Sequence, residues 1–284
     1  MSYLDHIRAC NNFDPADYRP FFVGEERAGF IRHALADHLR QWPDVFQLSD
    51  TAVRLESRFD DFESRSRAID APLRALAAEG LIEAWREEMY PVTPDWHVPP
   101  LMQIERAACP AFGIRAYGVH MTGYVRKPDG LHMWIARRAR DKPTFPGMLD
   151  NMVAGGQPIG IGLRENMIKE CAEEADIPEA IARHVVPVGM ISYTHAPPEG
   201  CKPDQMFCFD LELPESFTPK AVDGEVEAFY LWPIGKVAET VRDSFAFKFN
   251  CNLAIIDFLV RHGILTPDDE PDYAAIVQGL RAGG

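Results

Sequence analysis

Three glutamates within five residues are the side chains of this sequence best suited to metal chemistry. Glu170, Glu173 and Glu174 lie in the segment "LRENMIKECAEEA", in which good helix formers run without proline or glycine. Positions i, i+3 and i+4 share one helical face, so three like charges repel one another there. A divalent cation removes that repulsion, and magnesium prefers oxygen ligands while leaving room for substrate phosphates. The spacing predicts a metal site for phosphate chemistry, with a solvated acidic face as the alternative.

The glycine-rich turn before this helix makes the pattern more specific. The whole stretch "GGQPIGIGLRENMIKECAEEADI" resembles the signature of the Nudix hydrolases. Gly155 stands at the first glycine of that motif, Glu170 in its Arg-Glu pair, and Glu173 and Glu174 at its double glutamate. Ile177 stands at the closing aliphatic position. The resemblance covers about residues 115–245.

The resemblance implies a fold, an activity and a cofactor. The fold is an α/β/α sandwich with a mixed sheet, which agrees with an α/β pattern of strands and helices along the chain. The activity is hydrolysis of nucleoside diphosphates linked to another moiety, or of related diphosphates. The cofactor is Mg²⁺ or Mn²⁺, held by Glu170, Glu173 and Glu174.

Three positions depart from the motif: Ile161 replaces a glutamate, Lys169 an arginine, and Asp176 a glycine. The first two changes remove an ionic tie between loop and helix, so Ile161 is expected to hold the loop by burial instead. Aspartate tolerates the left-handed conformation better than most residues, so Asp176 is expected to end the helix. These changes leave the geometry of the loop and the rate of hydrolysis open. A catalytically weak protein that keeps the Nudix fold and binds a ligand is the alternative to an enzyme.

A second resemblance concerns the substrate. The context "FPGMLDNMVAGGQPIG" is similar to Nudix proteins related to the module associated with thiamine pyrophosphokinase, which carry an N-terminal companion region of this size. This resemblance implies hydrolysis of thiamine diphosphate, or of its damaged analogues, to the monophosphate and phosphate. ADP-ribose or a nucleotide sugar is the alternative substrate.

Further site residues are expected on both sides of the motif. Arg137, Arg138 and Lys142 could bind diphosphate oxygens, because arginine offers bidentate geometry to phosphate. Trp134 could cover a heterocycle, although aromatic residues in strands more often lie in the core. Many Nudix enzymes place another catalytic glutamate in a loop before a strand, and Glu225 lies in such a place, with Glu227 as the neighbouring alternative.

Composition limits the partners of the chain. Its 284 residues carry a formal net charge of -14, which argues against nucleic acid and anionic membranes as partners. A small-molecule diphosphate can still bind if a metal cation intervenes, and a homodimer is left open. Six scattered cysteines and a charged N-terminal segment favour free buried thiols and a cytoplasmic protein.

The pattern of elements predicts two units: a small α/β domain over 1–114 and a Nudix domain with C-terminal helices over 115–284. In the first, we expect a strand at 18–24, helices over 25–42 and 69–85, and a hairpin around Ser49 and Asp50. In the second, we expect a hairpin through 126–130, the glutamate helix over 164–175, and a late helix that stops at Gly263.

Overall fold

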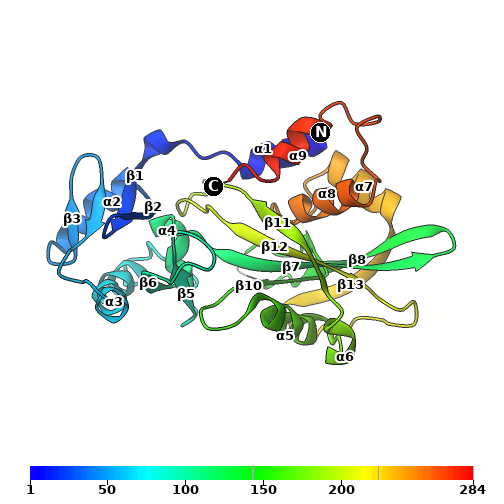
Figure 1. Ribbon diagram of the computed structural model, residues 1–284, viewed down its shortest axis with the longest axis horizontal. Helices are drawn as coiled ribbons and strands as arrows, with labels where there is room; N and C mark the ends of the chain where they lie inside the picture. The colour runs from blue at the N-terminus through cyan, green and yellow to red at the C-terminus, as the bar shows by residue number, and fades with distance from the viewer. Residues whose placement is uncertain (143, 223, 284) are drawn as a thin grey trace.

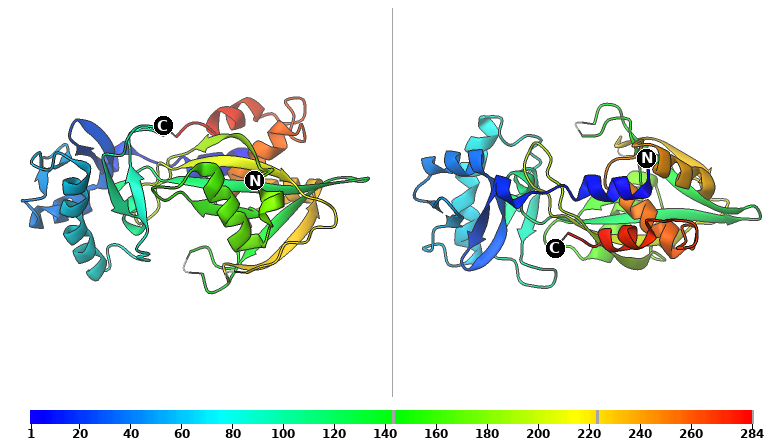
Figure 2. Two further views of the ribbon diagram at one scale, coloured as in Figure 1. Left: turned by 60° about the horizontal axis from the view of Figure 1, so that its bottom comes forward. Right: turned by 90° about the horizontal axis from the view of Figure 1, so that it is seen from above.

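The computed structural model describes residues 1–142, 144–222 and 224–283. The polypeptide forms two units that lie side by side along the longest axis of the molecule (Figure 1). The views of Figure 2 show the same separation, with the N-terminal unit at one end of a larger sheet-and-helix unit.

A four-stranded sheet in the order β2-β1-β4-β3 forms one part of the N-terminal unit. Its strands are β1 (Tyr18–Val23), β2 (Glu26–Arg32), β3 (Phe46–Leu48) and β4 (Val53–Leu55). The hairpin predicted around Ser49 is confirmed by the antiparallel pairing of β3 with β4. The helix predicted over 25–42 is wrong in its first half, because Gly24 turns the chain back with φ +61° and lets β2 pair with β1. Only α2 (His33–His38) and the 3₁₀ turn η2 (Leu39–Gln41) are helical there.

The rest of this unit consists of α3 (Phe62–Ala78) and a two-stranded sheet of β5 (Met89–Val92) and β6 (Met102–Glu105). The Asp61 carboxylate accepts a hydrogen bond from the backbone N–H of Ser64 at 2.6 Å and so begins α3 earlier than the predicted 69. Gly80, at φ +74°, follows the end of the helix. The 3₁₀ turn η3 (Arg106–Ala108) and α4 (Cys109–Phe112) then lead to the second unit.

A mixed seven-stranded sheet forms the centre of the second unit. Its main path is β11-β12-β7-β8-β13, with β10 paired to β7 and β9 paired to β8. The strands are β7 (Tyr117–Lys127), β8 (Gly130–Arg138), β9 (Leu149–Asp150), β10 (Val153–Gly156), β11 (Val186–Ser192), β12 (Gln205–Glu212) and β13 (Val226–Pro233). β7 pairs parallel to β12 and antiparallel to β8, which confirms both the mixed sheet and the hairpin predicted through 126–130.

Helices cover both faces of this sheet (Figure 1). On one face lie α5 (Leu163–Ala175) and α6 (Glu179–Ala182), and on the other α7 (Ile234–Asp243), α8 (Cys251–Arg261) and α9 (Tyr273–Gly279). Two separate hydrophobic clusters fill the space on either side of the strands. The predicted α/β/α sandwich is therefore confirmed, and a further core lies within the N-terminal unit.

The first helix, α1 (Tyr3–Cys10), packs far from the unit that follows it in sequence. Its buried residues Tyr3, Leu4 and Ile7 belong to the same cluster as α7, α8 and α9. The Tyr3 hydroxyl also donates to the carbonyl of Ala238 at 3.1 Å. The predicted division of the chain at residue 114 stays a prediction, but this helix has to be counted with the second unit.

The two units are joined by backbone hydrogen bonds. The N–H of Ile159 donates to the carbonyl of Met89 at 3.2 Å, and the N–H of Cys201 to that of Pro110 at 2.8 Å. All six cysteines are buried and free, as expected. Within the described residues, no helix is long and apolar enough to cross a membrane.

Candidate active site

The glutamates of interest project from α5, which is anchored by its opposite face. Met167, Cys171 and Ala175 are fully buried in the cluster between α5 and the sheet. The helix ends at Asp176, which adopts the left-handed conformation (φ 53°, ψ 36°) and donates its N–H to the carbonyl of Cys171. The predicted role of Asp176 as the helix end is confirmed.

Glu170 lies directly on the glycine strand. A Cβ atom at Gly155 would stand only 2.3 Å from the carboxyl carbon of Glu170, so only glycine leaves room for this carboxylate. The Glu170 side chain is 15% exposed. Burial raises the pKa of Glu170, Glu173 and Glu88 raise it further, and Lys169 lowers it. The carboxylate therefore lies at a place that favours binding of a positive charge.

The ammonium of Lys169 lies between two of the glutamates. Its Nζ donates to Glu170 Oε1 at 3.1 Å and to Glu173 Oε2 at 2.7 Å. The third glutamate, Glu174, accepts a hydrogen bond at its Oε2 from the backbone N–H of Ala154, at 2.9 Å. All three thus gather around β10 and the exposed side of α5, and a cation already bridges the first two.

Two buried amides hold the glycine loop to α5. The Asn166 Nδ2 donates to the Gly156 carbonyl at 2.7 Å and to Gln157 Oε1 at 3.0 Å. The Gln157 Nε2 donates in turn to the carbonyl of Ile161 at 2.6 Å. Ile161, which is expected from the sequence to hold the loop by burial, is only half-buried, so its burial can be only part of what holds the loop. Neutral hydrogen bonds replace the ionic tie of the motif.

Cationic side chains from the end of β8 and from the β8–β9 loop lie near Glu225. Lys142 Nζ lies 2.5 Å from Glu225 Oε1, and Arg138 Nη1 lies 2.9 Å from Asp150 Oδ2. Burial opposes ionisation of Glu225, but Lys142, Arg138 and Arg106 outweigh it and lower its pKa. Glu225 is thus held ionised among basic groups, whereas Glu227 pairs on the surface with Arg140 at 3.5 Å.

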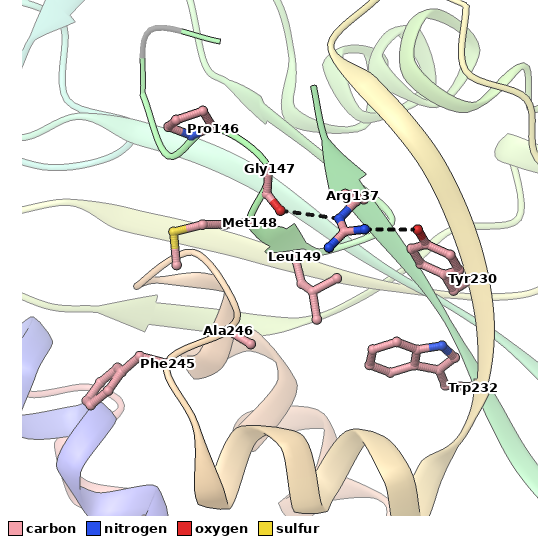
Figure 3. A pocket seen from close by; sticks show the side chains of 9 residues that line it. All are labelled: Arg137, Pro146, Gly147, Met148, Leu149, Tyr230, Trp232, Phe245 and Ala246. Atoms are coloured by element: carbon pink, nitrogen blue, oxygen red, sulfur yellow. Dashed lines mark hydrogen bonds between the residues drawn. The ribbon is translucent and has the colours of Figure 1, made fainter. Parts of the chain in front are cut away.

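Arg137 lies apart from Arg138, because consecutive strand residues face opposite sides of a sheet. Its guanidinium donates to the carbonyl of Gly147 at 3.3 Å and to the hydroxyl of Tyr230 at 3.5 Å (Figure 3). There it borders a pocket of about 370 Å³. The pocket is lined by Arg137, Pro146, Gly147, Met148, Leu149, Tyr230, Trp232, Phe245 and Ala246.

The structure separates the predicted substrate-binding residues into three places. Arg138 and Lys142 lie near Glu225, Arg137 lies in the pocket of Figure 3, and Trp134 lies in the hydrophobic cluster beneath α5. Trp134 is only 8% exposed and leaves little ring surface for a ligand. Its assignment to substrate binding is therefore at odds with its position, because a ring enclosed by core side chains lacks an open face.

Sequence reasoning missed several polar groups that the fold brings to this region. Lys248, which precedes α8, lies 3.8 Å from Asp150 Oδ2. Burial disfavours the charged form of Lys248. The carboxylates of Asp150 and Glu174 act against burial and raise the pKa of Lys248. Tyr90 and Arg106 reach the glycine strand from the N-terminal unit. No spacing in the sequence links these residues to the motif, because sheet pairing and unit contacts bring them there.

The donor set at Glu170, Glu173 and Glu174 fits a hard divalent cation, since carboxylate oxygens are the ligands that Mg²⁺ and Mn²⁺ prefer. In the ranges 1–142, 144–222 and 224–283, no group of three or more His, Cys, Asp or Glu side chains is arranged so that it could hold a metal ion. The ammonium of Lys169 lies instead between Glu170 and Glu173, at a position that a cation can take.

Comparisons with known proteins identify the family of the chain. Residues 2–116 match a family described as "Domain of unknown function (DUF4743)". The chain is 41% identical to Nudix hydrolase 20, chloroplastic, of Arabidopsis thaliana, over 98% of this chain and 77% of that protein. It is 39% identical to Nudix hydrolase 24, chloroplastic, of the same plant, over 99% of this chain and 78% of that protein. A solved structure, the Nudix domain of Shewanella oneidensis NrtR complexed with ADP ribose, is 13% identical with a TM-score of 0.42, covering 55% of this chain and 92% of that one.

The chain belongs to the Nudix hydrolase family. It is accordingly a hydrolase of diphosphate-containing substrates, and its motif residues are those that lie around β10 and α5.

Proposed function

We propose that this protein is a divalent-metal-dependent diphosphatase whose substrate is thiamine diphosphate or an oxidised analogue. The observation that carries the metal-dependent part is the arrangement of Glu170 and Glu173 around a cation, the Lys169 ammonium, against the floor at Gly155. Mg²⁺ or Mn²⁺ at this position would be held by the same carboxylates and would add positive charge for the substrate phosphates.

Separate residues of the site would bind the metal, bind the substrate and accept a proton. Glu170, Glu173 and Glu174 would hold the metal, which neutralises phosphate charge and lowers the pKa of a bound water. Glu225 is ionised, so it could accept a proton from the attacking water, although Lys142, Arg138 and Arg106 lower its pKa and make it a weaker base. Arg138 and Lys142 would offset the negative charge of the substrate oxygens.

The thiamine substrate is supported by the sequence around the glycine strand. The segment "FPGMLDNMVAGG" runs from the pocket of Figure 3 through β9 to β10, the strand on which Glu170 lies, so the residues that resemble the thiamine-related proteins include the glycine strand of the site. Cleavage between the two phosphates gives the monophosphate and inorganic phosphate.

A nucleotide-type substrate such as ADP-ribose is the second candidate, and the same pocket favours it. Tyr230 and Trp232 stack with their ring centroids 6.0 Å apart, beside the Arg137 guanidinium. A fixed guanidinium accepts a neutral planar ring such as adenine more readily than a cationic thiazolium, because like charges repel. Leu149 lines this pocket and directly precedes Asp150. The Asp150 carboxylate pairs with Arg138, one of the residues proposed to offset the charge of the substrate oxygens.

One set of kinetic measurements separates the two substrates. We would compare kcat/KM for thiamine diphosphate, an oxidised form of it and ADP-ribose, with Mg²⁺ and with Mn²⁺. A preference for ADP-ribose of tenfold or more, about 1.4 kcal/mol in transition-state binding, would contradict the thiamine proposal. Full activity in excess chelator would contradict metal dependence itself.

A further inference from the structure

Arg106 belongs to the N-terminal unit, yet its side chain reaches the glycine strand of the second unit. The guanidinium carbon lies 3.7 Å from the position that a Cβ atom would take on Gly156. The hydroxyl of Tyr90 lies 1.6 Å from the same position, so these two side chains close over Gly156. Gly156 directly follows Gly155, on which Glu170 lies, and consecutive strand residues face opposite sides, so Glu170 and Arg106 approach β10 from its two faces.

One carboxylate from each unit, Glu88 and Glu225, acts on this guanidinium. Its Nη1 donates to Glu88 Oε2 at 2.7 Å, and the backbone N–H of Arg106 donates to the Glu88 carbonyl at 2.8 Å. Although burial lowers the pKa of Arg106, the neighbouring Tyr90, Glu88 and Glu225 raise it above its ordinary value. Glu88 in turn raises the pKa of Glu170. Arg106 and Glu88 therefore share one electrostatic environment with the motif glutamate and with Glu225.

The geometry leaves the guanidinium available to a ligand. The Arg106 side chain is 47% exposed. In the described part of the chain, only its Nη1 donates a side-chain hydrogen bond, to Glu88, while a guanidinium offers five N–H donors. The Tyr90 ring lies beside it, with 5.7 Å between the guanidinium carbon and the ring centroid. A planar, oriented and half-open guanidinium is well suited to bidentate binding of a phosphate.

We propose that Arg106 binds phosphate oxygens of the substrate diphosphate at the site of Glu170, so that the N-terminal unit completes the active site. This inference rests on the proposed diphosphatase function. It assigns to the domain of unknown function a direct part in substrate binding, with the Tyr90 ring beside the guanidinium of Arg106.

The test is a binding measurement that needs no turnover. The probe is imidodiphosphate, a diphosphate with a P–N–P bridge, titrated by calorimetry with Mg²⁺ into the full chain. For Arg106→Ala we expect Kd to rise at least tenfold, which corresponds to about 1.4 kcal/mol. Arg106→Lys keeps the charge but loses the planar fork, so its Kd should lie between those of the two other proteins.

Arg74→Ala is the matched control. Arg74 lies in the same unit, pairs with the Glu87 carboxylate at 3.3 Å, stacks over Trp85 at 5.0 Å and is 53% exposed. It has the same chemistry as Arg106 without contact to the glycine strand, so its loss should leave the Kd for imidodiphosphate unchanged.

A purely structural role of the Arg106–Glu88 pair makes the opposite prediction for Glu88→Gln. If the pair only stabilises the N-terminal unit where it packs on Gly156, Glu88→Gln and Arg106→Ala should weaken imidodiphosphate binding equally, and that result would overturn the inference. If Arg106 binds phosphate, Glu88→Gln should leave Kd unchanged or tighten it, because it frees the guanidinium and removes a repelling charge. Unchanged binding in Arg106→Ala would also overturn it. Failure of the proposed function looks different: the wild-type protein would bind imidodiphosphate through Arg106 but hydrolyse no diphosphate ester.

Discussion

The ionised side chain of Glu170 favours metal binding but destabilises the folded protein. Burial raises its pKa, so its ionised form is disfavoured in the folded protein relative to the unfolded chain. This cost is absent at low pH, appears as the pH rises above the ordinary pKa of a glutamate, and is complete above the raised pKa. At neutral pH, the carboxylate therefore binds a cation well and stabilises the fold poorly.

We predict that Glu170→Gln loses at least about 10²-fold in kcat and unfolds at a higher temperature near pH 7. Glutamine keeps the size of the side chain but removes the charge that binds the metal and that burial disfavours. The measurements are metal-dependent turnover and thermal unfolding. Glu173→Gln is the control for stability, because that side chain is 52% exposed. Unaltered turnover in folded Glu170→Gln or Glu174→Gln protein would refute the assignment.

His120 provides a pH test. Burial, with a contribution from Lys248, lowers its pKa to about 4, and its Nδ1 lies 2.9 Å from Asn151 Oδ1. The unfolded chain takes up this proton near pH 6.5 and the folded chain near pH 4, so stability falls as the pH drops through that window. The total loss is roughly 3 kcal/mol, at about 1.4 kcal/mol per pH unit.

His120→Gln should flatten this part of the stability profile. Urea unfolding at pH 7.5, 6 and 5 measures it, and the exposed His184→Gln serves as the control. A profile in His120→Gln as steep as in the wild type would show that other groups cause the acid sensitivity.

At the scale of elements, the loop between β10 and α5 is held by two neutral amides. Asn166 is fully buried and donates to both Gly156 and Gln157. This hydrogen-bonded tie positions the strand that carries Gly155 relative to the helix that carries Glu170. The motif's missing ionic pair is thus no sign of a disordered loop.

Asn166→Ala should destabilise the protein by about 1–3 kcal/mol, since it leaves buried polar groups without partners. We also expect weaker Mn²⁺ binding, because the loop is no longer fixed to α5. Chemical unfolding and a Mn²⁺ titration followed by electron paramagnetic resonance measure the two effects. Glu165→Ala, one residue earlier and exposed, should change neither. If Mn²⁺ affinity stays unchanged in Asn166→Ala, the tie has no part in forming the site.

Elements with local signals could be predicted from the sequence, and those decided by tertiary contacts could not. The glutamate helix, its end at Asp176 and the hairpin through 126–130 depend on helix propensity and turn chemistry within a few residues. The strand at Glu26–Arg32 has helical spacing but pairs with β1, so a non-local contact overrides the pattern. Arg106 and Lys248 come to the site through such contacts as well.

At the scale of the whole molecule, α1 connects the beginning of the described chain to its last helices. Ile7 is 4% exposed, and a Cβ on Gly279 of α9 would lie 2.3 Å from its Cγ2. The core above the sheet is therefore complete only with α1 in place, although about 100 residues of the N-terminal unit follow it in sequence.

Ile7→Ala should cost about 2–4 kcal/mol, the usual range for truncating a fully buried aliphatic side chain. Urea unfolding gives the value, and Arg8→Ala, whose side chain is 71% exposed, is the control on the same helix. A cost below about 0.5 kcal/mol would mean that α1 is only loosely attached to α8 and α9.

The position of α1 also has a consequence for synthesis on the ribosome. This helix leaves the exit tunnel before nearly all other elements, whereas α8 and α9 are translated about 240 residues later. At roughly 5–20 residues per second, α1 waits on the order of 10–50 seconds for its partners. During that time Leu4 and Ile7 are exposed to solvent, while the N-terminal unit, whose contacts lie within residues 21–114, can already fold. Nascent chains halted before residue 250 should therefore bind chaperones at the segment of α1, Tyr3–Cys10.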